Sequence, residues 1–427
     1  MDNYNYILKS ERKKEKLLDE IKNYNERNIV TEIREEIKLY KNKKNKRIFL
    51  FYGLRGIGKS TALLQIIKEN KDAMYIDGTE ISYYNLELIK VIEEYKKINK
   101  SNILIIDELN DIPNWGKALK ILYDSENLKI IATGSSAIKI SQEIKEIIRR
   151  SKIKKLQALS FKEFLKLKYN IEYNITNEIK DILFSKKEDA FIKIKNLNLD
   201  ILKKNQDIEK HFREYIYEGI PLMINTGEKI QDISQNIIYK IIVDDFKNIT
   251  GFNIKTIDKS KKIIRAIAEA KPGHTSFKNL SDNFDISATT ISEIINAFKI
   301  SELIIETYVN KKSMAKYRKE PKILFSSSAI RYGLLLNNFD ETDIGTLRED
   351  AFVSNIIYSG LNVNYIAENK KTPDFEISDD KNKVIVEIGG QNKKTKQIKK
   401  GFIITESNKI DIINNVIYMP LYMVCLI

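Results

Sequence analysis

The chain has very little cysteine and histidine: one cysteine, Cys425, and two histidines among 427 residues. A single cysteine cannot form an internal disulfide, and so few Cys and His side chains cannot assemble a zinc cluster. Long apolar runs are also missing, because the longest, 416–427, is interrupted by Pro420 and is shorter than a membrane span. No leader-like segment follows Met1, so we expect a cytoplasmic protein that does not enter a membrane.

Basic residues outnumber acidic ones, with 73 Lys and Arg against 59 Asp and Glu and a formal net charge of +14. This excess permits binding to nucleic acid. The chain is also crowded with Ile and Asn, a composition typical of AT-rich coding sequences, so the charge alone does not establish DNA binding. At this length we expect about three domains.

The most informative motif is a glycine-rich loop between an apolar strand and a helix-like segment. Residues 53–61 read GLRGIGKST, the G-x-x-x-x-G-K-S pattern of a P-loop. Its glycines let backbone amides surround phosphates, and the positive end of the following helix adds attraction. We expect Lys59 to reach the β- and γ-phosphates and Ser60 to ligate Mg²⁺, so ATP and Mg²⁺ are the predicted cofactors. The other predicted nucleotide-binding residues of the loop are Gly53, Arg55, Gly56, Ile57, Gly58 and Thr61.

Two further strand ends supply polar residues that a P-loop site needs. A continuous apolar run ends in Asp107 and Glu108, as expected for a strand buried on both faces. We predict that Asp107 holds Mg²⁺ and that Glu108 polarises the attacking water as a general base. After the next strand, Ser135 is a candidate to sense the γ-phosphate or to position water, with Thr133 behind it. Small polar residues after a strand are also ordinary turn formers.

The order of the segments predicts an α/β protein. Strand-like and helix-like stretches alternate over residues 46–165, which indicates a parallel sheet covered by helices and forms the predicted ATPase core. Residues 1–45 have helical spacing with alternating Lys and Glu, which predicts an exposed helical lead-in. Residues 166–255 have few strand signals and many i, i+3, i+4 apolar spacings, which predicts a helical lid beside the nucleotide.

Residues 256–320 carry three short helix-like patterns followed by a strand, the order of a winged helix-turn-helix. In a DNA reader of this kind, Thr289, Thr290, Ser292 and Asn296 would face a groove. The alternative is a winged helix used only for packing or protein contacts, because few basic residues lie on that face. The predicted wing is basic and contains Lys311, Lys312, Lys316, Arg318 and Lys319.

Together these motifs resemble a prokaryotic AAA-type ATPase of the archaeal-ATPase group, related to the STAND ATPases. Residues 159–165, LSFKEFL, are similar to that group's P-L-S-F-x-E-F-L run, and residues 218–221 to its G-x-P turn. The resemblance implies that Pro221 lies against the nucleotide. It also implies that Arg150 is a catalytic arginine that senses phosphate, within the chain or across a subunit interface, with Arg149 as a substitute. A solvated basic helix face is the alternative for Arg150.

Residues 321–427 resemble the PD-(D/E)xK nuclease fold, which the same group often carries at its C-terminus. The resemblance implies that Glu349, Asp374 and Glu387 hold a divalent metal. The lysine expected two positions after Glu387 is replaced by Gly389. The side chains that might reach in from the next turn are Gln391, Lys393 and Lys394. We therefore predict weak metal binding without appreciable DNA cleavage, and we favour a degenerate nuclease fold that serves as a docking or nucleic-acid-binding module.

The leading functional prediction is a cytoplasmic ATPase switch coupled to double-stranded DNA. One alternative is a metal-dependent nuclease that the ATPase only gates. Another is a non-hydrolysing, nucleotide-bound regulator or docking protein. A homo-oligomer or a protein partner is left open.

Overall fold

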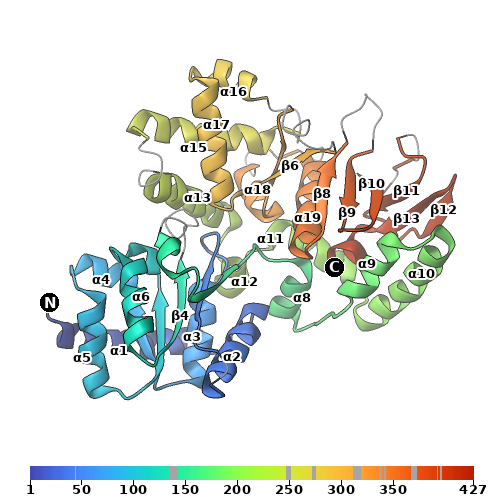
Figure 1. Ribbon diagram of the computed structural model, residues 1–427. Helices are drawn as coiled ribbons and strands as arrows, with labels where there is room; N and C mark the ends of the chain where they lie inside the picture. Colours follow the sequence, from blue (N-terminus) through green and yellow to red (C-terminus); the bar gives the residue numbers. More distant parts are fainter. Residues whose placement is uncertain are drawn as a thin grey trace. The chain divides into compact units, whose positions relative to one another are not determined.

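The computed structural model describes residues 1–43, 45–134, 143–246, 252–271, 276–310, 319–335, 339–340, 343–366, 373–391, 393–394 and 397–427. They divide into two compact units (Figure 1). The first comprises Met1–Ala158 with Ile300–Glu302, and the second Leu159–Lys299 with Leu303–Ile427. Each unit has its own sheet and hydrophobic core. No helix in these described ranges is long and apolar enough to cross a membrane.

The first unit is built on a five-stranded sheet with the order β2-β3-β4-β1-β5, and every pairing in it is parallel. The strands are β1 (Ile48–Tyr52), β2 (Met74–Asp77), β3 (Ile103–Asp107), β4 (Lys129–Gly134) and β5 (Ser151–Lys155). The predicted parallel sheet is confirmed, and β1 to β4 lie where the apolar runs predicted them. Strand β5 was not predicted, because its sequence SKIKK carries the charges of an exposed edge strand.

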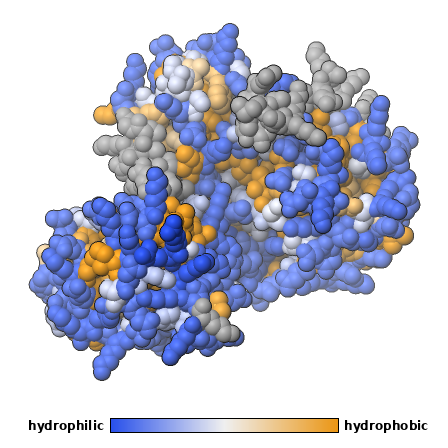
Figure 2. Space-filling model, viewed as in Figure 1, coloured by the Kyte–Doolittle hydropathy of each residue, from blue (hydrophilic) through white to orange (hydrophobic). Residues whose placement is uncertain are grey.

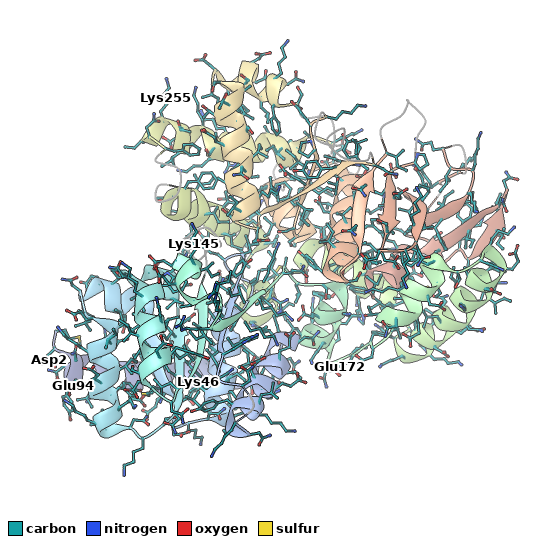
Figure 3. All side chains as sticks on the ribbon, viewed as in Figure 1. Asp2, Lys46, Glu94, Lys145, Glu172 and Lys255 are labelled. Atoms are coloured by element: carbon teal, nitrogen blue, oxygen red, sulfur yellow. The ribbon has the colours of Figure 1, made fainter. Side chains whose placement is uncertain are left out.

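Helices flank this sheet and include the N-terminal segment. They are α1 (Asn3–Glu20), α2 (Asn28–Lys41), α3 (Lys59–Glu69), α4 (Gly78–Tyr83), α5 (Leu88–Ile98), the 3₁₀ turn η1 (Leu109–Asp111) and α6 (Trp115–Ser125). Residues 1–45 are not an exposed lead-in. Tyr6 and Ile7 of α1 belong to the core of the unit, and buried Glu36 of α2 pairs with buried Lys129 at 3.0 Å. Figure 3 shows many charged side chains on the outer surface. In the sequences of α1 and α2 these charges outnumber the apolar residues that form the buried face of the helix, so that face was not recognised.

The second unit contains an eight-stranded sheet with the order β12-β13-β11-β10-β9-β8-β6-β7. Its strands are β6 (Ile304–Val309), β7 (Lys322–Phe325), β8 (Asn362–Tyr365), β9 (Phe375–Ser378), β10 (Lys383–Gly389), β11 (Gly401–Thr405), β12 (Asp411–Ile413) and β13 (Val416–Pro420). Strand β6 pairs antiparallel with β7 on one side and parallel with β8 on the other. The predicted boundary at residue 320 is therefore wrong, because it separates two strands that share backbone hydrogen bonds.

The helices α8 (Phe161–Tyr169), α9 (Thr176–Phe184), α10 (Lys187–Lys204) and α11 (Ile208–Glu218) share one hydrophobic core with the C-terminal sheet. Phe164 and Ile201, for example, belong to the same buried cluster as Ile404 and Met419. The structure thus corrects the predicted lid, since residues 161–218 form part of the core of the second unit. Their apolar spacings predicted helices correctly but could not identify the surface that buries them.

Three helices precede the β6–β7 hairpin, as the sequence predicted. They are α15 (Ile254–Glu269), α16 (Phe277–Phe284) and α17 (Ala288–Ile300). The remaining elements of the unit are α12 (Pro221–Thr226), α13 (Ile230–Lys240), the π-helical turn η2 (Ile241–Phe246), α18 (Ser328–Leu335), α19 (Ile344–Tyr358) and α20 (Leu421–Cys425).

A fully buried ion pair joins α18 to α19. The Arg331 side chain contacts Asp350 at 2.6 Å, and its Nη1 donates to the backbone carbonyls of Ile267 at 3.2 Å and Ala268 at 3.1 Å near the end of α15. Asp350 also accepts from the backbone N–H of Phe325 at 2.9 Å. Helices α15, α18 and α19 and strand β7 are thereby held together by one network.

Candidate nucleotide site

The P-loop connects β1 to α3 and depends on its glycines for shape. Gly56 and Gly58 have φ angles of 77° and 87°, in the left-handed region that favours glycine. Gly53 is needed for a different reason: a Cβ there would lie 2.1 Å from the backbone oxygen of Leu156. The loop therefore curls where β1 ends, as the motif predicted.

Lys59 is buried and stretches back along its own loop. Its Nζ donates to the carbonyl oxygens of Gly53 at 2.9 Å and Leu54 at 2.8 Å. Neutral carbonyls orient the ammonium without cancelling its charge. These two neutral acceptors do not oppose its attraction to a phosphate.

The predicted metal ligands are Ser60, which follows the P-loop after β1, and Asp107, which ends β3. In the parallel sheet β4 alone lies between β1 and β3, so the ends of these strands lie at the same edge. Asp107 is buried and accepts a hydrogen bond from Thr133 Oγ1 of β4, and the Ser60 hydroxyl of α3 lies near enough to favour its ionised form. Burial, and then the nearby charge of Glu108, raise the pKa of Asp107, while the two hydroxyls favour its ionised form. A hydroxyl beside a carboxylate is a donor set that fits Mg²⁺.

Glu108 has an unusual backbone conformation, with φ at 49° and ψ at 45°. Its N–H donates to Asp107 Oδ1 at 3.1 Å and to Thr133 Oγ1 at 3.3 Å. Gly78 allows this turn to pack closely, since a Cβ there would lie 2.2 Å from the Glu108 carbonyl oxygen. A non-glycine residue held in the left-handed region is typical of functional positions that require a fixed side-chain direction.

Arg27 is a positioning residue that the sequence did not predict. It is buried, and its guanidinium donates to the carbonyls of Ile57 in the P-loop at 2.8 Å and of Gln157 after β5 at 3.2 Å. Nothing in the sequence distinguishes Arg27 from the other charges of residues 1–45. The contact becomes visible only when the N-terminal helices are packed on the sheet.

Arg150 is not brought to the P-loop within this unit. Its backbone oxygen accepts from Ile48 N–H at 2.9 Å, so it lies where β1 begins, whereas the P-loop follows the end of β1. The five residues of β1 separate the two positions by roughly 16 Å. The Arg150 side chain instead pairs with Asp124 through two contacts of 2.9 Å. In this position Arg150 does not reach the P-loop of its own unit, and its action across a subunit interface stays a prediction.

Two other predicted residues are not placed in this site by the structure. Ser135 lies outside the described residues. Pro221 begins α12 in the second unit, so its contact with the nucleotide stays a prediction. The wing residues Lys311, Lys312, Lys316 and Arg318 also lie outside the described residues.

The acidic residues predicted in the C-terminal sheet form a linked cluster. Asp374 N–H donates to Glu387 Oε2 at 3.1 Å, and Ile388 N–H donates to Asp374 Oδ2 at 2.8 Å. Burial, and then the charge of Asp374, raise the pKa of Glu387 to about 7. Burial raises the pKa of Glu349 as well, and Asp374 adds to this shift.

Two lysines already compensate these acids. Lys393 pairs with Glu387, and Lys322 pairs with Glu349 at 2.5 Å. Gly389 makes room for the first pair, because a Cβ there would lie 2.5 Å from Lys393 Cδ. Lys393 therefore reaches the acid whose expected lysine partner is missing. Within the described residues, no group of three or more His, Cys, Asp or Glu is arranged to hold a metal ion.

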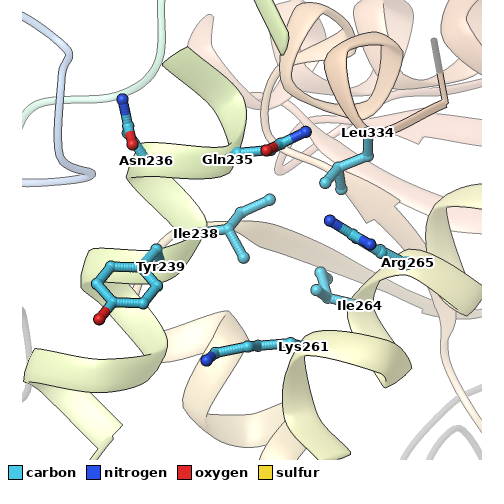
Figure 4. Close-up of a pocket in the computed structure, with 8 residues that line it drawn as sticks. All are labelled: Gln235, Asn236, Ile238, Tyr239, Lys261, Ile264, Arg265 and Leu334. Carbon is cyan, nitrogen blue, oxygen red and sulfur yellow. The ribbon is translucent and has the colours of Figure 1, made fainter. Parts of the chain in front are cut away.

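A separate cavity of about 220 Å³ lies between α13, α15 and α18 in the second unit (Figure 4). Lys261 and Arg265 enter it from consecutive turns of α15, and the Lys261 ammonium lies 5.1 Å from the centre of the Tyr239 ring. None of the predicted site residues lines this cavity.

Comparisons with known protein families match two parts of the chain. Residues 45–165 match a family model described as an AAA domain, and residues 209–341 match a domain of unknown function. An uncharacterized protein of Methanocaldococcus jannaschii is 28% identical over 430 residues, which cover 91% of this chain and 86% of that relative. An uncharacterized protein of Haemophilus influenzae is 24% identical over 265 residues, which cover 57% of this chain and 58% of that relative.

Among solved structures, the RuvB Holliday junction branch migration motor of Thermotoga maritima is similar to this chain at 14% identity and a TM-score of 0.30. The similarity covers 66% of this chain and 90% of the motor. A mutant of the same motor gives a TM-score of 0.34. The AAA-domain match and the parallel sheet with its P-loop support an AAA-type P-loop ATPase fold for residues 45–165.

Proposed function

We propose that this protein is an AAA-type ATPase switch that binds ATP with Mg²⁺ and hydrolyses it. The observation that carries the proposal is the buried Asp107 carboxylate at the end of the P-loop sheet, which accepts from Thr133 and lies near the Ser60 hydroxyl. A structural turn would not need a buried carboxylate beside the helix that follows a glycine-rich loop. The AAA-domain match over the same residues supports this proposal.

Each residue of the site has a role that follows from its position. The loop amides and Lys59 bind and orient the phosphates, and Ser60 and Asp107 would hold Mg²⁺, which neutralises charge on the transferring phosphoryl group when bound. Glu108 accepts a proton from the attacking water as the general base. Arg27 keeps the loop in shape through the Ile57 carbonyl.

The direct test is steady-state ATP hydrolysis by the full chain, with and without duplex DNA. Glu108→Gln should retain nucleotide binding and lose turnover by about 100-fold or more, as expected for loss of a general base. Glu93→Gln, at an exposed acid of α5, is the matched control and should hydrolyse ATP normally. Equal turnover by wild type and Glu108→Gln would disprove the catalytic assignment.

We further propose that the second unit couples the switch to double-stranded DNA through a winged helix. The supporting observation is that Thr289, Ser292 and Asn296 are exposed on one face of α17, whose opposite face is buried. The β6–β7 hairpin that follows has the order of a wing.

Binding of a fluorescent duplex at low salt tests this proposal. Ser292→Glu with Asn296→Glu places negative charge where a phosphate or base edge would lie, and should weaken binding at least tenfold. Asn177→Glu, an exposed position of α9, is the control for the added charge. If both variants bind as the wild type does, the helices serve packing or protein contacts.

For the carboxylate cluster we propose a docking or nucleic-acid-binding role without cleavage. Its acids are compensated by Lys322 and Lys393, which supports a site that binds metal weakly. Cleavage of plasmid DNA with Mg²⁺ or Mn²⁺ that Glu387→Ala abolishes would overturn this proposal in favour of a nuclease gated by the ATPase.

A further inference from the structure

The second unit carries a groove lined by lysines that none of the predicted sites explains. It has a volume of about 880 Å³ and lies where β9 ends and where β10 and β11 begin, beside the turn between α9 and α10. Figure 1 shows α9 and α10 next to these strands, and Figure 2 shows a mostly hydrophilic surface there. Five lysines and two glutamates line it. The lysines are Lys186, Lys187, Lys381, Lys383 and Lys400.

The groove has an excess of positive charge. Both glutamates already have partners, since Lys187 pairs with Glu188 and Lys383 pairs with Glu376, each at 3.3 Å. The other three lysines of the groove form no ion pair with any residue that the structure describes. Their charges are therefore available to an anionic ligand.

Local structure holds the walls of the groove in place. The Asp379 carboxylate accepts from the backbone N–H groups of Lys381 at 2.8 Å and Asn382 at 2.6 Å, which closes the β9–β10 turn. On the opposite wall, Lys187 Nζ donates to Asn415 Oδ1 at 2.8 Å. The backbone that carries the lysines is thus arranged before any ligand binds.

Gly401 determines the path of the backbone at the start of β11, which forms a third wall of the groove. Its φ is 125°, and a Cβ there would lie 2.1 Å from the carbonyl oxygen of Ile385. Only glycine lets the chain enter β11 so close to β10. This constraint sets the position of Lys400, the residue before it.

We propose that this groove binds the backbone phosphates of double-stranded DNA, as a contact surface additional to α17. Small-molecule pockets are mostly apolar with a few polar groups, whereas five lysines line this groove. Lysine ammonium groups on flexible stems suit phosphates, which need no fixed donor geometry. The groove lies at the other end of β9 and β10 from Asp374 and Glu387, so it is distinct from the carboxylate cluster.

The test is binding of a fluorescent 30-bp duplex to the full chain over a range of salt concentrations. Replacing Lys186, Lys381 and Lys400 together with Gln should lower affinity roughly tenfold at about 50 mM salt. It should also reduce the slope of log affinity against log salt by about two to three units, since each lost phosphate contact contributes about 0.9. The same three positions changed to Arg should retain wild-type behaviour.

The control removes three exposed lysines elsewhere in the same unit, Lys195, Lys203 and Lys210, by change to Gln. An equal loss in this control would overturn the proposal, because net charge alone would then explain binding. If polyglutamate binds wild type as tightly as the duplex and competes with it, the groove is a site for an acidic protein segment instead. The α17 variants are measured in parallel, so failure of the winged-helix proposal is distinguished from failure of this one.

Discussion

At the P-loop, the Lys59 ammonium donates to two backbone carbonyls, whereas at the C-terminal sheet the Lys393 ammonium pairs with the Glu387 carboxylate. Lys59 begins α3 after the P-loop, and Lys393 follows the end of β10. The two carbonyls orient the first without neutralising it. The second has much of its charge cancelled at close range. We infer that the first arrangement is suited to an incoming anion, while the second stabilises the fold around it.

The acids of the two sites also differ in the charge of the side chains that contact them. Burial raises the pKa of Asp107, but the Thr133 hydroxyl that donates to it favours its charged form and leaves lone pairs for a metal. Glu349 and Glu387 are held by lysines that a metal would have to displace. Similar residues can therefore form a ligand site or a structural ion-pair cluster, depending on which side chains already satisfy them.

The strongest test of this comparison exchanges the two lysines for alanine. Lys59→Ala should weaken ATP binding by about 100-fold or more, because a buried cation that offsets the phosphate charge is lost. Lys393→Ala should leave ATP affinity unchanged. Isothermal titration with a non-hydrolysable ATP analogue measures both. Normal affinity in Lys59→Ala would show that the loop does not bind phosphates.

Arg27→Ala should lower ATP turnover by roughly tenfold, because the Ile57 carbonyl loses a buried donor and the loop loses a constraint. Arg27→Lys should restore part of the activity, since one ammonium can reach only some of the acceptors. Thermal unfolding is followed alongside, so that a general loss of structure is recognised. Unchanged kinetics with both substitutions would limit Arg27 to a packing role.

Glu387 should make the stability of the second unit depend on pH. Its pKa is raised from 4.5 to about 7, so the folded chain binds this proton more tightly than the unfolded chain does. The free energy of unfolding should therefore fall as the pH rises from about 4.5 to about 7. Urea unfolding at several pH values checks this. Glu387→Gln should flatten the profile, while Glu228→Gln, at an exposed acid, should not.

The smallest effect is expected at Arg150. Arg150 lies just before β5, and its side chain pairs with Asp124 of α6. Arg150→Ala should therefore change ATP turnover less than twofold at low protein concentration. A large loss that grows with protein concentration would indicate that Arg150 completes the site of a neighbouring subunit. Turnover measured over a range of protein concentrations separates these outcomes.

The parts of the site formed by local sequence could be predicted, and those formed by distant contacts could not. The P-loop could be recognised from the spacing of its motif, and the ends of β3 and β4 from the apolar runs that precede them. Arg27 is different, because its contact with Ile57 requires the N-terminal helices to be packed on the sheet. Lys393 was one of three candidates from the turn after β10, and the sequence could not choose among them, because the choice depends on the space that Gly389 leaves for its side chain.

Domain boundaries were harder to predict than strands for a related physical reason. Helical periodicity identifies which face of α8 to α11 is apolar but not the surface that covers it. Strand β6 likewise has two hydrogen-bonding edges, and only its pairing with both β7 and β8 joins the hairpin to the C-terminal sheet. The edge strand β5 escaped detection because its three lysines leave it no apolar run.

The shared core of α8 to α11 with β11 and β13 has a consequence for how the protein is made. During translation, nearly all of the first unit leaves the ribosome early and can fold while synthesis continues. The side chains of Phe164 and Phe212 cannot be fully buried until β13, the strand that carries Met419, has been synthesised. For most of that interval the nascent chain exposes a large hydrophobic surface. The second unit should therefore depend on chaperones during synthesis, and the first should not.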